Sequence, residues 1–158
     1  MRDKPVVLRL PARVRSEAGA ELVEFALVLP LLLLIFGGIV DFGLLLQRQQ
    51  VVTNAAREGA RLAVLPGYTT ADVQARVTQF VREGMNNATA TPTTVVTPVT
   101  ITPGSGPPFQ AAQVQVTLSD TFLILGPIAS LAGGGGSFGT VNLGATTTMR
   151  VESVTAGS

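Results

Sequence analysis

Apolar residues run almost without interruption from Leu22 to Leu46, and within these 25 residues only Glu24 and Asp41 are charged. A helix rises about 1.5 Å per residue, so this stretch covers about 37 Å and can cross a hydrocarbon core of about 30 Å. Pro30 lies inside the run and predicts a kink or local unwinding near residues 26–30. We therefore predict a transmembrane helix at about residues 22–46.

Two interpretations of Asp41 stay open. It follows Glu24 by 17 residues, or about 25 Å along a helix axis. If Glu24 lies near one membrane interface, Asp41 lies near the other. Asp41 is then either an interfacial carboxylate that reaches water or a contact to a neighbouring subunit in an assembled filament.

The helical pattern continues beyond the apolar run, since no breaker follows until Pro66 and Gly67. Small residues recur at a spacing of four, at Ala55, Gly59 and Ala63, and such a row lets another backbone approach closely. We expect one long helix over residues 20–65. The small residues either pack on the chain's own sheet or make helix–helix contacts in an assembly.

The polar remainder predicts a small exported domain over residues 66–158. An amphipathic helix is expected at 70–84, capped by Thr70; its apolar face comprises Val73, Val77, Phe80, Val81 and Met85. Strands are expected at 95–101, at 113–118 and at 140–151, and Pro98 favours an edge position for the first of them. The fold class is therefore α+β, with a long N-terminal helix packed on a small antiparallel sheet and one extra helix.

Residues 122–131 form an uncharged apolar stretch between two of these strands. The stretch is too short to span a membrane and contains Gly126 and Pro127. It is either a loop that covers the sheet or a patch that touches the outer leaflet or a partner subunit.

Composition narrows the possible functions. The chain has 158 residues, 46% of them hydrophobic and 13% charged, with no Cys and no His. This excludes disulfides, Cys/His zinc sites, thiol nucleophiles and histidine general bases. The acidic side chains are scattered, so we expect no enzyme activity and no cofactor or metal.

Charge is distributed unevenly along the chain. Residues 1–19 hold five basic and two acidic side chains (5 − 2 = +3), and the remainder holds six basic and eight acidic ones (6 − 8 = −2). The positive-inside rule predicts a single-pass protein with its N-terminus in the cytoplasm and its C-terminus outside. Without a basic patch on the exported part, nucleic-acid binding is not expected.

The residues at the start of the apolar run carry a family resemblance. Gly19, Glu24, Phe25, Asp41 and the segment at 55–61 together resemble the TadE-like family, pseudopilins of the tight-adherence (Tad/Flp) type IV pilus system. The resemblance covers about residues 17–65 and implies a pilin-like fold. It also implies a basic leader, residues 1–19, that a membrane aspartic prepilin peptidase removes.

The same resemblance implies specific roles and partners. Gly19 and Ala20 would flank the cut, and Glu24, followed by Phe25, would be the assembly glutamate at the fifth position of the mature chain. The implied partners are the prepilin peptidase, other pilin-like subunits and the Tad assembly machinery of the bacterial inner membrane, in addition to membrane lipid. The implied role is assembling or priming the pilus, with the chain held in the inner membrane or incorporated in the surface pilus.

Elementary electrostatics supplies a reason for Glu24. Cleavage before Ala20 creates an α-amine that is cationic near neutral pH. In a bundle of such helices a carboxylate from an axially staggered neighbour would neutralise that amine, and breaking such a pair in a low dielectric is costly.

Alternatives remain at this stage. A cleaved secretory signal has a shorter apolar region and a small-residue site, whereas here the run continues to Leu46 and Gln47 follows. A plain signal anchor fits the apolar run but leaves Glu24 unexplained. The second functional class is an unprocessed single-pass binding module or adhesin of the cell envelope.

Overall fold

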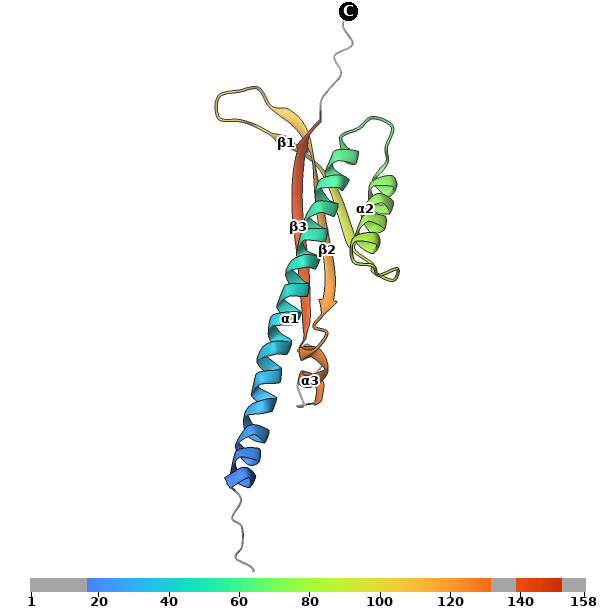
Figure 1. The fold of residues 1–158 in the computed structure, drawn as a ribbon. Helices are drawn as coiled ribbons and strands as arrows, with labels where there is room; N and C mark the ends of the chain where they lie inside the picture. Colours follow the sequence, from blue (N-terminus) through green and yellow to red (C-terminus); the bar gives the residue numbers. More distant parts are fainter. Residues whose placement is uncertain (1–16, 132–138, 152–158) are drawn as a thin grey trace, which may run out of the picture. The chain divides into compact units, whose positions relative to one another are not determined.

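A computed structural model describes residues 17–131 and 139–151 (Figure 1). Most of the predicted leader, residues 1–16, lies outside the described residues. The described elements, in chain order, are α1 (Glu17–Ala63), α2 (Thr70–Gly84), β1 (Thr93–Ile101), β2 (Phe109–Thr121), α3 (Leu125–Leu131) and β3 (Thr140–Arg150). The chain divides into two units between Phe36 and Gly37.

The N-terminal unit contains the first part of α1. Every residue from Gly19 to Phe36 is exposed, although most of them are apolar. The helix continues through Pro30, so the predicted local unwinding does not occur. Proline removes one backbone donor, and the remaining hydrogen bonds of this long helix hold the turn.

The second unit is built on a three-stranded antiparallel sheet in the order β1-β2-β3. The pairing runs from Thr93 opposite Thr117 to Ile101 opposite Phe109 on one side of β2. On the other side it runs from Ala111 opposite Arg150 to Thr121 opposite Thr140. The strand β1 lies at the edge, as Pro98 predicted.

One hydrophobic core lies between the sheet, the C-terminal part of α1 and α2. Its buried members are Val52, Ala55, Ala56 and Ala60 of α1, Val73, Val77 and Val81 of α2, Val114, Val116 and Leu118 of β2, Leu143 of β3, and Ala90 in the loop before β1. The predicted alternation in β2 is confirmed, because Val114, Val116 and Leu118 face this core. Phe80 and Met85 pack against it while partly buried, so the predicted apolar face of α2 is confirmed as well.

Local signals explain where α2 begins and ends. Thr69 is the N-cap, and its side chain accepts a hydrogen bond from the Asp72 backbone N–H while the Asp72 carboxylate accepts from the Thr69 N–H. The predicted cap at Thr70 is therefore wrong by one residue, since a capping box requires its acidic partner three positions after the cap. After Gly84 the chain turns through Asn86, whose φ is 49°.

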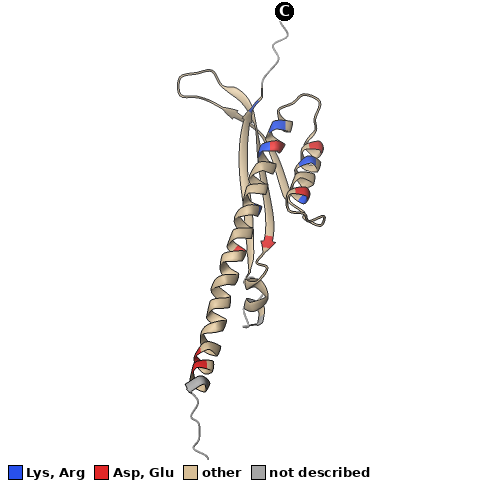
Figure 2. Cartoon of the chain, viewed as in Figure 1, with Lys and Arg blue, Asp and Glu red and all other residues tan. Residues whose placement is uncertain are grey.

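The α+β architecture is confirmed. The strands β1 and β2 are longer than predicted, β3 ends one residue earlier than predicted, and the described residues hold two helices besides α1 where one was expected. The second extra helix is α3, which occupies most of the stretch at 122–131. It is uncharged in both its first and last turns. Figure 2 shows charged residues on α2 and along the C-terminal part of α1, and none on α3.

Candidate membrane anchor and assembly segment

The predicted processing and assembly residues lie in the first three turns of α1. Gly19 and Ala20 are the third and fourth residues of this helix, and both are exposed. Glu24 is also exposed, one helical turn after Ala20 and on the same face. Phe25 beside it is 58% exposed. This end of the helix therefore presents the predicted cleavage site, a carboxylate and an aromatic ring together.

The helix α1 is long and apolar enough to cross a membrane over Gly19–Ala63, and only 6% of its most apolar stretch is buried. A core helix of a soluble protein would be mostly buried. Large apolar side chains remain exposed along it, among them Leu27, Leu31, Leu33, Ile35, Phe36, Ile39 and Phe42. Such a contiguous apolar surface indicates contact with lipid or with other helices.

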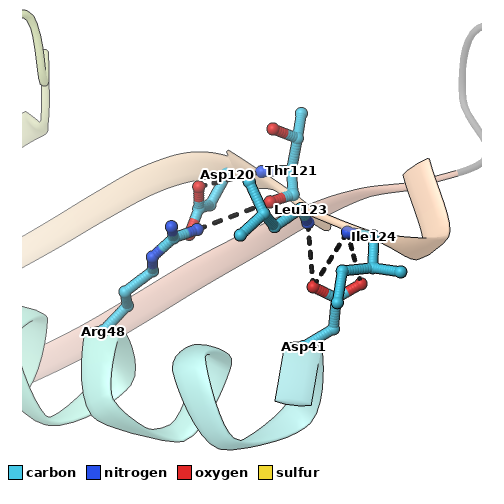
Figure 3. Close-up of polar contacts among 6 residues, drawn as sticks. All are labelled: Asp41, Arg48, Asp120, Thr121, Leu123 and Ile124. Carbon is cyan, nitrogen blue, oxygen red and sulfur yellow. Dashed lines mark hydrogen bonds and ion pairs between the residues drawn. The ribbon is translucent and has the colours of Figure 1, made fainter. Parts of the chain in front are cut away.

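The carboxylate of Asp41 does not reach water, contrary to the first of the two interpretations, and a contact of Asp41 to a neighbouring subunit stays a prediction. The Asp41 side chain is only 3% exposed, and it accepts hydrogen bonds from three consecutive backbone amides of the same chain. The Leu123 and Ile124 N–H groups donate to Oδ1 at 3.0 and 3.1 Å. The Ile124 N–H also donates to Oδ2 at 3.0 Å (Figure 3). The Leu125 N–H donates to Oδ2 at 2.7 Å.

The Asp41 carboxylate therefore satisfies the amides that lead into α3. Helix N-terminal amides lack partners within their own helix, and here they converge on a single charged acceptor. Gly37, one turn before Asp41, allows the close approach: a Cβ at Gly37 would lie 2.7 Å from Ile124 Cγ2. We call this set of contacts the Asp41 anchor.

An ion pair lies next to the Asp41 anchor. Arg48 Nη1 is 2.5 Å from Asp120 Oδ2, and it also donates to the Thr121 carbonyl at 3.4 Å (Figure 3). Sequence reasoning missed this pair, although a signal existed. Arg48 lies two turns after Asp41 on the same helix face and is the first basic residue after the apolar run.

The small residues of α1 lie within the chain's own core. Ala55 is fully buried, and a Cβ at Gly59 would lie 2.7 Å from Val77 Cγ2 and 3.2 Å from Val114 Cγ1. Ala63 is partly buried against the same core. These positions let α2 and β2 approach α1 closely, and contacts to a second subunit there stay a prediction.

Glu58 links α1 to α2 at the edge of this core. Its carboxylate pairs with Arg61 at 3.0 Å and with Arg76 of α2 at 3.3 Å. The hydrogen bond from Arg61, followed by its charge and by the bond and charge of Arg76, lowers the pKa of Glu58 against the opposing effect of burial. Among residues 17–131 and 139–151, no three acidic side chains gather as a metal site would require.

Comparison with known proteins shows a similarity over most of α1. The family model for TadE-like protein matches residues 19–61, a little over a quarter of the chain. The resemblance predicted from the sequence is therefore confirmed over this segment. No curated protein and no solved structure matches the chain.

Proposed function

We propose that the chain is a pilin-like assembly protein (a pseudopilin) of a Tad pilus, because residues 19–61 match the family model for TadE-like protein. In this proposal α1 anchors it in the bacterial inner membrane as a single span, with the N-terminus in the cytoplasm. Prepilin peptidase then cuts after Gly19. The mature chain enters or primes the pilus together with other pilin-like subunits and the Tad machinery.

The observation that carries the proposal is the exposed group Gly19, Ala20, Glu24 and Phe25 at the very start of an apolar helix. The family match begins at Gly19 itself. Gly19 and Ala20 lie in the first described turn of α1, so unwinding the backbone around the proposed scissile bond would disturb only one end of the described helix. A peptidase can therefore reach this bond with α1 otherwise intact.

The proposal is structural rather than catalytic. The chain contains no His and no Cys, and several acidic side chains of the described residues pair with arginines or cap backbone amides. Asp41, Asp72 and Glu58 are all used in this way. Specific function then rests on the surface of α1 and on how copies of it pack.

Glu24→Ala, in the protein expressed in its native host, is the test, with Glu21→Ala as the matched control. Both glutamates are exposed on the same stretch of α1, but only Glu24 lies at the fifth position after the cut. We expect the wild-type protein and both variants to begin at Ala20 by N-terminal peptide mass spectrometry. We expect only Glu24→Ala to lose more than about tenfold of its incorporation into the assembled fraction, since breaking a buried ion pair costs about 3–5 kcal/mol.

Two results would count against the proposal. Normal incorporation of Glu24→Ala would refute the assembly role of this carboxylate. A native chain that begins at Met1 would refute processing and would favour the alternative, an unprocessed membrane-anchored binding module or adhesin.

A further inference from the structure

We propose that the segment from Phe122 to Leu131, including α3, is a second membrane-contacting element that lies in the outer leaflet beside α1. The inference rests on the part of the proposed function in which α1 spans the membrane. It is independent of peptidase processing and of pilus assembly. The occupant of the exposed face of this segment is lipid.

The position of the Asp41 anchor sets the depth of this segment. Gly37 and Asp41 precede Leu46, the end of the apolar run, by nine and five residues, or about 13 and 8 Å along the helix axis. Ile124 packs over Gly37, and its amide is bound by Asp41. If α1 crosses the membrane along its apolar run, the start of α3 is held inside the hydrocarbon region rather than above it.

The charges of the second unit mark the same boundary. Arg48 and Asp120 pair with each other. Arg48 is the first charged residue after Asp41 on α1, and Asp120 is the last charged residue of β2, just before Leu123. From Thr121 to Met149 the chain holds no charged side chain at all. Charged side chains in the bilayer are costly. A segment that enters the bilayer after Asp120 must therefore be uncharged, as residues 122–131 are.

The backbone amides that lead into α3 are paired. Unpaired N–H groups are not tolerated in hydrocarbon, and the three amides that enter α3 all reach Asp41. The one hydroxyl of α3, that of Ser130, donates to the Pro127 carbonyl at 2.7 Å. The carboxylate of Asp41 is itself nearly enclosed by these donors, which explains how a charge is accommodated within the apolar run.

Large apolar side chains are exposed both on the segment from Phe122 to Leu131 and on the adjacent part of α1. Leu123 is 63% exposed and Ile128 44% exposed, although both carry large apolar side chains. On α1 the neighbouring residues Ile39 and Phe42 are 67% and 59% exposed. These side chains of α1 and of the α3 segment form apolar surface next to the Asp41 anchor. Lipid that contacts α1 there therefore also contacts α3.

Single tryptophan residues test the proposal directly, because the chain contains none. Ile128→Trp reports on α3, Phe42→Trp is the control within the span, and Tyr68→Trp is the control in the loop after α1, where Tyr68 is 53% exposed. Each full-length chain is reconstituted in phosphatidylethanolamine–phosphatidylglycerol vesicles with or without brominated acyl chains. Tryptophan emission and its quenching by bromine are measured at low and high protein-to-lipid ratios.

We expect Ile128→Trp to emit at short wavelength and to lose as much fluorescence to brominated lipid as Phe42→Trp does, at both ratios. Tyr68→Trp should emit at long wavelength and stay unquenched. Quenching of Phe42→Trp without quenching of Ile128→Trp would overturn this inference alone. Absence of quenching in both would overturn the membrane span too, and quenching of Ile128→Trp that disappears at high protein density would assign its face to a second copy instead of lipid.

Discussion

Replacing Asp41 by alanine removes the acceptor of three consecutive backbone amides, and its effect can be estimated from the structure. The donor–acceptor distances are 2.7–3.1 Å, and hydrogen bonds to a charged group contribute about 1.5–3 kcal/mol each. The freed amides regain some solvent when the segment opens. We therefore take about 2–4 kcal/mol as the loss in the local opening free energy, which is about 30- to 900-fold in amide protection.

Hydrogen exchange of the full chain in vesicles, followed by mass spectrometry, measures this loss. We expect peptides that cover residues 122–128 to exchange faster in Asp41→Ala by that factor, while the strands of the sheet stay protected. Asp41→Asn should fall between wild type and Asp41→Ala, because it keeps one carbonyl oxygen for two of the three amides.

The matched control removes a carboxylate that caps a different helix. Asp72→Ala deletes the partner of the Thr69 N–H and should speed exchange only at the start of α2. If residues 122–128 exchange at the wild-type rate in Asp41→Ala, the carboxylate does not hold this segment and the physical reasoning about the Asp41 anchor is refuted.

Two further predictions concern the core and its acid stability. Gly59→Val should lower the free energy of unfolding by about 1–3 kcal/mol through overpacking, since even a Cβ there would lie 2.7 Å from Val77 Cγ2. Thermal melting followed by circular dichroism measures this loss. The control Gly104→Val, where a Cβ meets nothing within 4 Å, should melt at the wild-type temperature. The lowered pKa of Glu58, caused first by its hydrogen bond from Arg61, contributes stability that is present above the ordinary pKa of 4.5 and is lost as pH falls through the lowered folded value. Melting temperatures measured between neutral and acidic pH should therefore fall less in Glu58→Gln than in wild type, and equal slopes would contradict the assignment.

Much of the fold could be predicted because its signals are local. The absence of breakers before Pro66 predicted the length of α1, and period-four apolar spacing predicted the buried face of α2. Alternation predicted the central part of β2, whose ends at Phe109 and Thr121 were missed because their side chains alternate less clearly. Pro98 predicted the edge strand because a proline cannot donate to a second neighbour.

The α3 helix and the Asp41 anchor could not be predicted in the same way. A seven-residue helix containing Gly126 and Pro127 has no amphipathic period, and apolar side chains on all its faces give no preference for helix over loop. The partners of Asp41 lie more than eighty residues away, so only the tertiary fold reveals them. Glu24 is the opposite case, since its proposed partner belongs to another subunit and its role stays a prediction.

The sequence separation of the Asp41 anchor has a consequence for biogenesis. Asp41 is synthesised 82 to 84 residues before the amides that bind it. In a chain inserted as proposed, α1 enters the bilayer while this carboxylate has no internal donor, and it stays unpaired until β1 and β2 have been translocated. The final position of α1 in the bilayer is then coupled to export of the C-terminal domain. In a truncated or stalled chain the Asp41 carboxylate stays without its backbone donors, which distinguishes that chain from the folded protein.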